Sequence, residues 1–231
     1  EQQGLSNEEA RKRLWFVDVE GLVVQSRTDL MSHNLPYAHD HTGSDFVSAI
    51  KDIEPDVLIG ATGAPGTFTE EVIRTMAGIN DRPVIFALSN PTTSAECTAE
   101  QAYKWSDGRA IFASGSPFAP VTCKGVTRRP AQGNNAYIFP GIGLGAIISE
   151  AKVISEDMFL AAAAALAAEV TDDDVAEGAI YPRLPMIRDV SAKIAERVAD
   201  VAQKEGVAGV IAPDGYGSII RDYMYDPTYS T

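Results

Sequence analysis

The sequence predicts an α/β fold, in which a doubly wound parallel sheet is followed by a mostly helical C-terminal segment. In the first half, short continuous apolar runs alternate with segments of helical periodicity, and this alternation is typical of βαβ units. After about residue 134 only helical patterns recur strongly. We therefore expect a sheet-containing domain over residues 1–133 and a mostly helical segment over residues 134–231.

Four apolar runs predict the strands of the sheet. They are rich in β-branched and aromatic residues and do not alternate with polar residues, which indicates strands that are buried on both faces. The runs lie at residues 14–18, 57–61, 84–88 and 110–113. In the second half of the chain, only the short segment 207–212 suggests a further strand.

Amphipathic segments between and after these runs predict the helices. They lie at residues 6–13, 46–53, 69–79, 98–105, 142–153, 158–170 and 186–203. Two of them begin with the spacing of a capping box, formed by Ser6 with Glu9 and by Thr98 with Gln101. Because right-handed crossovers bring the carboxyl ends of parallel strands to one edge, we expect ligand-binding residues at that edge.

Charge and composition exclude several classes of partner. The 231 residues include 19 basic and 32 acidic side chains, and the net charge of −13 argues against a nucleic-acid partner. No apolar run approaches the ~18–20 residues that span a bilayer, and residues 1–4 lack a signal-peptide pattern. Cys97 and Cys123 fit neither a disulfide framework nor a zinc site. We therefore expect an intracellular protein, cytoplasmic or in an organelle matrix, with no membrane partner.

The first candidate binding residue is Asp18, which ends the first apolar run. In dinucleotide-binding folds an acid at this place accepts hydrogen bonds from the adenosine ribose. Val19 and Glu20 follow it, and no neighbouring arginine or lysine would neutralise a 2′-phosphate, so the pattern favours NAD over NADP. An ordinary turn aspartate before Gly21 is the alternative interpretation.

A glycine-rich turn follows the second apolar run. Gly60, Gly63 and Gly66 have the spacing G-x-x-G-x-x-G, which differs from the G-x-G-x-x-G of the pyrophosphate-binding turn. Glycines here would let backbone N–H groups approach an anion or a flat ring at a helix N-terminus. The alternative is an ordinary strand-to-helix turn that binds nothing.

Three asparagines are further candidates. Asn90 follows the third apolar run, and its side chain offers a donor and an acceptor to a carboxylate or a carboxamide. A simple Asx-Pro turn is the alternative. Asn134 and Asn135 stand beside Gly133 ahead of a helix, where they can donate hydrogen bonds to an anion. The alternative for this pair is a capping loop.

No motif supplies a catalytic group. His39 and His41 bracket Asp40 without the spacing of a standard zinc site. Cys97 has no neighbouring histidine that would activate it as a nucleophile, and neither a G-x-S-x-G turn nor a Walker lysine occurs. We therefore assign no catalytic residue and no metal ligand to this chain.

Taken together and in order, several segments of the chain closely resemble the malic enzymes. The resembling segments are 14–18, 82–92, 95–100, 112–118 and 132–141, with Tyr181 and Pro182 ahead of Ile187 and Arg188. The resemblance covers essentially the whole chain. It implies oxidative decarboxylation of malate to pyruvate and CO₂, with NAD or NADP and with Mn²⁺ or Mg²⁺.

The resemblance also implies roles for the candidate residues. Asp18 would hold the adenosine ribose, and the turn that contains Ala61, Thr62 and Gly63 would run near the nicotinamide. Asn90 would contact both the cofactor and malate. The pair Asn134 and Asn135 would contact malate. A homo-oligomer is implied for the complete enzyme.

Residues that the family carries ahead of this segment have no counterpart in this sequence. They are the first strand of a Rossmann-type sheet with its glycine-rich turn, a catalytic tyrosine, a catalytic lysine and the carboxylates that bind the metal. We therefore expect the C-terminal part of a malic enzyme, with residues 1–133 as a partial NAD-binding Rossmann domain. The metal would bind through the missing N-terminal part.

A sheet without its first strand has a physical consequence. In the strand order 3-2-1-4-5 the first strand lies between the second and the fourth. The runs at residues 14–18 and 57–61 would then each expose an unpaired apolar edge, which favours aggregation. Two alternatives remain, namely a non-catalytic nucleotide-binding or regulatory module derived from the family, and a dehydrogenase of another hydroxy or amino acid.

Overall fold

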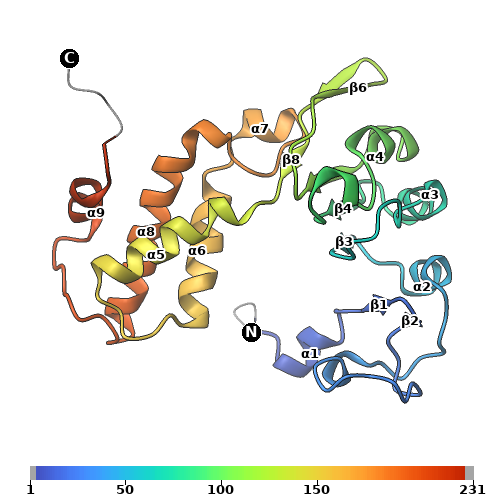
Figure 1. Cartoon of the computed structure of the whole chain (residues 1–231), viewed down its shortest axis with the longest axis horizontal. Coiled ribbons are helices and arrows are strands. Elements are labelled where there is room, and N and C mark those ends of the chain that lie inside the picture. The colour runs from blue at the N-terminus through green and yellow to red at the C-terminus, as the bar shows by residue number, and fades with distance from the viewer. Residues whose placement is uncertain (1–3, 227–231) are drawn as a thin grey trace.

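The computed structural model describes residues 4–226 of the chain. The expectations that concern residues 1–3 and the residues from Pro227 onward lie outside these described residues. Figure 1 shows a sheet-containing part and a helical part side by side, joined through the segment between β8 and α5. Within the described residues, none of the helices combines the length and the apolar character needed to cross a membrane.

The central sheet has four parallel strands in the order β3-β4-β5-β8. Their bounds are β3 Val57–Gly60, β4 Val84–Ala87, β5 Ile111–Ser114 and β8 Ala131–Gln132. The first three confirm apolar runs that the sequence predicts as strands. Strand β8 was not predicted because two residues carry no periodicity. The parallel sheet confirms the predicted fold class.

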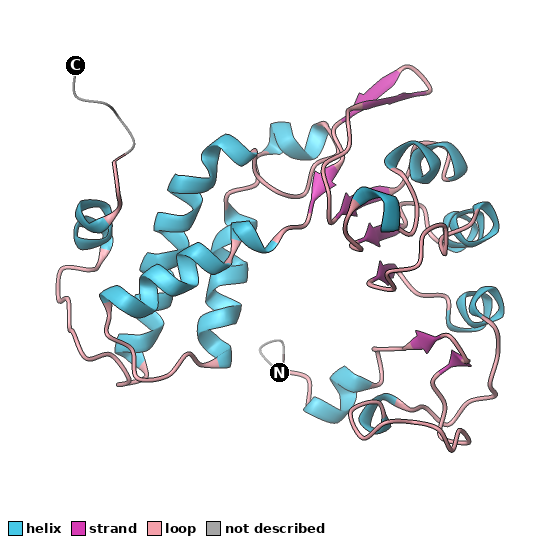
Figure 2. Ribbon diagram, viewed as in Figure 1, coloured by secondary structure: helices cyan, strands magenta, loops and turns pink. Residues whose placement is uncertain are grey.

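Three helices cover one face of this sheet, as Figure 2 shows in cyan beside the magenta strands. They are α2 (Phe46–Ile53), α3 (Glu70–Ile79) and α4 (Ala99–Trp105). The side chains of Leu58, Ile85 and Phe112 point from the strands into their shared core. The predicted capping box of Thr98 and Gln101 is confirmed at the start of α4.

The opposite face of the sheet is open at its β3 end. Val57 and Ile59 lie on this face with exposed fractions of 46% and 61%. Strand β3 pairs only with β4 among the described strands, so its other edge is unpaired. The expected unpaired apolar edge at residues 57–61 is therefore confirmed.

The expectation of a strand buried on both faces at residues 14–18 is wrong. Only β1 (Val17–Asp18) is extended there, and it pairs in antiparallel fashion with β2 (Gly21–Leu22) outside the central sheet. Both residues of β1 are exposed. Since no parallel strand of the described chain lies beside it, the segment folds back on itself at Glu20. Figure 1 shows this hairpin beyond β3, on the side away from β4.

Shorter elements connect these strands and helices in both parts of the chain. Helix α1 (Asn7–Arg11) begins with the predicted capping box of Ser6 and Glu9, which is confirmed. Strands β6 (Val121–Cys123) and β7 (Val126–Arg128) form an antiparallel hairpin. The 3₁₀ helices are η1 (Leu35–Tyr37), η2 (Thr92–Ser94), η3 (Asn135–Tyr137) and η4 (Leu184–Met186).

The second part of the chain is helical, as predicted. Helices α5 (Phe139–Ile148), α6 (Glu156–Ala168) and α8 (Ile187–Lys204) share one apolar core, with α7 (Asp172–Ala176) and α9 (Gly217–Tyr223) at its borders. Their ends differ by a few residues from the predicted ones.

The predicted strand at residues 207–212 is wrong. No other strand lies beside this segment in the described chain. The N–H groups of Gly209 and Val210 instead donate to the Ser149 carbonyl oxygen at the end of α5, at 2.8 and 3.0 Å. The segment therefore folds as a loop.

Candidate active site

The carboxyl edge of the central sheet brings most of the predicted residues together. Ala61, Thr62 and Gly63 follow β3, Asn90 follows β4 and Asn134 follows β8. All five are exposed, so a ligand can reach them. Hydrogen bonds connect the turns that follow neighbouring strands, and these bonds make the edge one continuous structure.

Glu96 is the centre of this network, and it is not among the candidate residues predicted from the sequence. It lies between η2 and α4, and none of its surface is exposed. Its Oε1 accepts hydrogen bonds from the Thr62 N–H and Oγ1–H, both at 2.9 Å, and from the Ser89 hydroxyl. Its Oε2 accepts from the Ser89 N–H at 3.3 Å. The carboxylate therefore joins the turns after β3 and β4.

The packing around Glu96 leaves no room for a side chain at Gly60. A Cβ built there would lie 2.6 Å from Glu96 Cδ and 2.7 Å from the ring of Phe68. Real Cβ atoms do not come this close to their neighbours. The sequence suggested that Gly60 gives a ligand access to the backbone. In the structure, a glycine is needed at this position because the Glu96 side chain and the Phe68 ring pack against it.

Burial and hydrogen bonding shift the pKa values of Glu96 and Cys97. Burial alone raises the pKa of Glu96, but hydrogen bonds from Ser89 and Thr62 outweigh it and leave the pKa below its ordinary value. Glu96 is therefore ionised at neutral pH. Burial, with a contribution from the Glu96 charge, raises the pKa of Cys97 to about 12. This thiol is protonated at neutral pH and is a poor nucleophile.

The backbone N–H groups of the turn after β3 have acceptors within the protein. Thr62 donates to Glu96, Gly63 donates to Ser89 Oγ at 2.8 Å and Ala64 donates to Thr62 Oγ1 at 3.1 Å. The sequence suggested an anion or a flat ring as the ligand of this turn. These three N–H groups are not free to donate to an anion, because each already has an acceptor.

Asn90 is oriented by the turn after β5. Its Oδ1 accepts a hydrogen bond from Ser116 Oγ at 2.5 Å, and its Nδ2 donates weakly to the Leu88 carbonyl oxygen at 3.4 Å. A Cβ on Gly115 would lie 2.3 Å from that same carbonyl oxygen, so only glycine fits there. The peptide bond between Asn90 and Pro91 is cis. The Asn90 amide is thus held at the edge by Ser116 and Leu88, and the residue is exposed.

Asn134 and Asn135 lie where the chain leaves the sheet for the helical part. The Gly133 N–H donates to the Ser114 carbonyl oxygen at 2.8 Å, which fixes this segment to β5. Asn134 Oδ1 accepts from the Ala136 N–H at 2.8 Å. The capping interpretation is therefore confirmed for this oxygen, while both asparagines remain exposed.

Asp18 lies apart from this edge, on the β1–β2 hairpin. Its Oδ1 accepts from the Glu20 N–H at 2.9 Å, as a turn aspartate does. The Arg27 guanidinium donates to both carboxylate oxygens, at 2.8 and 3.0 Å. Hydrogen bonding from Arg27 lowers the pKa of Asp18. The sequence argument that no basic residue stands beside Asp18 is therefore wrong, because the eight residues between them bring Arg27 back to the carboxylate.

The histidines pack against aromatic and backbone groups. His39 stacks on Trp15 with ring centroids 3.7 Å apart, and its Nε2 lies 2.9 Å from the Leu14 carbonyl oxygen. His41 meets Trp15 edge to face. Across residues 4–226, no group of three histidine, cysteine, aspartate or glutamate side chains is arranged to hold a metal ion.

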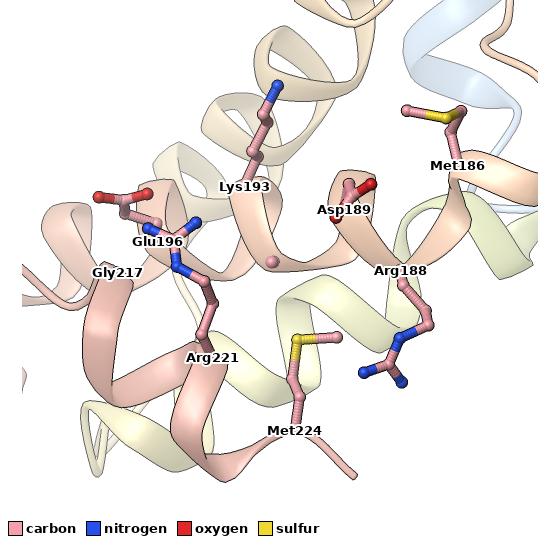
Figure 3. Close-up of a pocket in the computed structure, with 9 residues that line it drawn as sticks. Met186, Arg188, Asp189, Lys193, Glu196, Gly217, Arg221 and Met224 are labelled. Carbon is pink, nitrogen blue, oxygen red and sulfur yellow. The ribbon is translucent and has the colours of Figure 1, made fainter. Parts of the chain in front are cut away.

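A groove of about 260 Å³ lies between α8 and α9, away from the sheet. Figure 3 shows that basic side chains (Arg188, Lys193 and Arg221) alternate there with Asp189 and Glu196. Small-molecule sites are commonly ~300–1,000 Å³ and mostly apolar. None of the predicted residues lines this groove, so it is separate from the candidate site.

Comparison with known families shows where the chain belongs. The family model described as "Malic enzyme, NAD binding domain" matches residues 1–203. The chain belongs to the malic enzyme family. This membership excludes a dehydrogenase family of another hydroxy or amino acid as its source.

Proteins with similar sequences are also named malic enzymes. The chain is 48% identical over 233 residues to an NADP-dependent malic enzyme of Dictyostelium discoideum, covering 99% of this chain and 43% of that protein. It is 52% identical over 231 residues to NADP-dependent malic enzyme 1 of Arabidopsis thaliana, covering 99% of this chain and 40% of that protein. The chain thus spans about two fifths of the length of these malic enzymes.

A solved structure supports the fold. The malic enzyme of Entamoeba histolytica matches with a TM-score of 0.70 and 24% identity, over 90% of this chain and 41% of that chain. At this identity the match is evidence for the fold alone. It agrees with the parallel sheet and the helical part described above.

Proposed function

We propose that this chain supplies the dinucleotide site and part of the malate site of a malic enzyme. The complete enzyme would convert malate to pyruvate and CO₂ while it reduces the dinucleotide. The convergence of the residue 61–63 turn, Asn90 and Asn134 at the carboxyl edge of a parallel sheet carries this proposal, because ligands bind at that edge in α/β folds. The family membership supports it.

Each residue has a role in this proposal. Asp18 accepts hydrogen bonds from the adenosine ribose. The face of the turn formed by Ala61, Thr62 and Gly63 lies against the nicotinamide ring, because its amides already have acceptors. The Asn90 amide, together with Asn134 and Asn135, binds the carboxylate of malate and the carboxamide of the cofactor. Residues 1–133 would act as the dinucleotide-binding unit.

The reaction also needs groups that residues 4–226 do not provide. No carboxylate or imidazole cluster among them fits Mn²⁺ or Mg²⁺, so we assign the metal ligands, the acid and the base to the part of the malic enzymes that this chain does not span. A bound divalent ion would polarise the substrate oxygen and stabilise the enolate left by loss of CO₂. A homo-oligomer and an intracellular location belong to the same proposal.

For the cofactor we propose NAD in preference to NADP. Arg27 is the basic group closest to Asp18, but it is shared between Asp18 and Asp29, which lies 2.5 Å from it. Two carboxylates thus share one guanidinium, and Glu20 adds a third acidic residue close in sequence. This excess of negative charge disfavours a 2′-phosphate. The similar proteins named above are NADP-dependent, so the preference needs a direct test.

The test is a steady-state assay of the full-length protein with malate, Mn²⁺ and either dinucleotide. We expect pyruvate, CO₂ and reduced dinucleotide in equal amounts, with kcat/KM higher for NAD. Full-length protein that oxidises no malate with either dinucleotide would overturn the proposed function. Equal or better use of NADP would overturn only the cofactor preference.

The 231-residue chain alone provides the matched comparison. We expect it to bind no dinucleotide tightly, because the first strand of the cofactor domain and its glycine-rich turn have no counterpart in this chain. We expect no malate turnover, because the acid, base and metal ligands are assigned elsewhere. Metal-dependent turnover by the isolated chain would contradict this division of the site.

A further inference from the structure

We propose that Glu96 is a positioning residue, which holds the turn after β3 and the turn after β4 at a fixed separation so that cofactor and substrate meet in a reactive arrangement. This inference rests on the function proposed above. Glu96 has no exposed surface, so it acts through Thr62 and Ser89.

The geometry requires a carboxylate at this place. All four groups that contact Glu96 donate hydrogen bonds, two from Thr62 and two from Ser89. A glutamine has the same shape, but its NH₂ group would face one of these donors. An aspartate is one methylene shorter and would not reach both turns. The ionised glutamate is therefore the side chain that satisfies all four donors.

Ser89 transmits this position to groups that face a ligand. Its Oγ accepts from the Gly63 N–H at 2.8 Å while it donates to Glu96. The next residue is Asn90, which Ser116 holds from the other side at 2.5 Å. A shift of Ser89 would therefore move both the residue 61–63 turn and Asn90. Misplacement of reacting groups by about 1 Å costs on the order of 100-fold in rate.

The experiment compares Glu96→Gln and Ser89→Ala with wild type in the full-length protein. The readouts are kcat, the KM of each substrate, and the primary isotope effect with malate deuterated at C2. We expect kcat/KM to fall by roughly 10- to 100-fold for Glu96→Gln and less for Ser89→Ala. The isotope effect should rise in both, because hydride transfer becomes more rate-limiting when its geometry is disturbed.

Asp174→Asn is the matched control. Asp174 is also a buried, hydrogen-bonded carboxylate, with an exposed fraction of 5%, but it lies at α7. Loss of a purely structural carboxylate should lower the melting temperature of the protein and leave the isotope effect at its wild-type value. If Glu96→Gln and Ser89→Ala behave like this control, the proposal is overturned. If Glu96→Gln does not fold, Ser89→Ala decides alone.

Amide hydrogen exchange separates this proposal from the proposed function. The peptide that contains Thr62 and Gly63 should exchange faster in Glu96→Gln than in wild type or in Asp174→Asn. This readout needs no malate turnover, so it tests the positioning even if the full-length protein acts on another substrate. Unchanged exchange at these amides would overturn the positioning role, whereas absent malate turnover would overturn only the function.

Discussion

Asp18 forms an ion pair with Arg27 at the β1–β2 hairpin. The Arg27 side chain is only 14% exposed, and it holds the carboxylate through two hydrogen bonds while Asp29 occupies its other side. The guanidinium fixes the direction of the Asp18 carboxylate, which the proposed function uses as a ribose acceptor. Orientation by a rigid, planar partner is typical of arginine.

Replacing Asp18 with Asn tests that role in the full-length protein. A hydrogen bond to a charged acceptor contributes ~1.5–3 kcal/mol, and ~1.4 kcal/mol corresponds to a tenfold change in affinity. We expect the KM of the dinucleotide to rise by roughly 10-fold or more while kcat at saturation changes little. Asp29→Asn is the control, since Asp29 shares Arg27 but lies outside the strand end. Equal effects of the two changes would contradict the assignment.

At the residue scale, the sequence located the exposed candidates but not their supports. Asn90 follows directly after a predicted strand, so its position could be inferred from local pattern. The role of Glu96 could not be inferred in this way, because one of its two partners, Thr62, is 34 residues away and only the folded sheet brings them together. Arg27 was missed for the same reason at Asp18. Support residues depend on long-range contacts, which a local reading of the sequence does not contain.

At the scale of elements, helix α5 packs against α8 through a glycine. A Cβ on Gly145 would lie 2.5 Å from the Ala195 carbonyl oxygen and 2.9 Å from Val198 Cβ. Gly143 lies in the same helix with nothing within 4 Å of its Cβ position. The two glycines therefore differ in packing but not in secondary structure.

This pair gives a prediction about stability in the 231-residue chain. Gly145→Ala should destabilise by about 1–3 kcal/mol because it overpacks the contact. Gly143→Ala should stabilise by about 1 kcal/mol, because alanine is the better helix former. Urea unfolding followed by circular dichroism measures both. A shift in the same direction for both variants would contradict the packing of α5 on α8.

A second contact between elements joins the end of β7 to α7. Arg129 Nη2 lies 2.5 Å from Asp174 Oδ1, and Arg129 Nε lies 3.1 Å from Glu177 Oε2. Burial alone raises the pKa of Asp174, but hydrogen bonds from Thr171 and the charge of Arg129 outweigh it and lower the pKa below its ordinary value of 3.8. The ionised carboxylate therefore stabilises the folded state above that pH.

Arg129→Gln tests this contact through its pH dependence. Near neutral pH we expect a loss of about 3 kcal/mol, because the buried Asp174 charge would lose its closest basic partner and keep only the more distant Arg183. A lowered folded-state pKa gives stability that is present above pH 3.8 and lost as the pH falls through the folded-state pKa. The difference from wild type should thus shrink below pH 3.8. Arg183→Gln should cost less, since Arg183 is 54% exposed. A difference that stays constant with pH would contradict the contact.

At the scale of the whole molecule, the central sheet is covered on one face and open on the other at β3. Continuous apolar runs predicted the parallel sheet. The unpaired edge at residues 57–61 was predicted from the first strand that the family resemblance implies is absent from this chain. The prediction failed at residues 14–18, which it placed in the same sheet. Whether an apolar run becomes a buried strand depends on a neighbouring strand, and none of the described strands is parallel to β1.

The open face predicts self-association of the isolated chain. Ile59 is 61% exposed beside an unpaired strand edge, and such edges favour aggregation. We expect light scattering to rise with concentration for the 231-residue chain and to fall for Ile59→Lys. Val126→Lys is the control, because Val126 is 48% exposed on the β6–β7 hairpin instead. Equal suppression by both changes would point to net charge rather than the sheet face.

The central claim is that one dinucleotide site extends from the β1–β2 hairpin to the carboxyl edge of the sheet. A crystal structure of the full-length protein with bound dinucleotide tests it most directly. The claim predicts the adenosine ribose within hydrogen-bonding distance of Asp18 and the nicotinamide ring against the turn formed by Ala61, Thr62 and Gly63. A dinucleotide bound elsewhere, or one that touches neither Asp18 nor this turn, would contradict it.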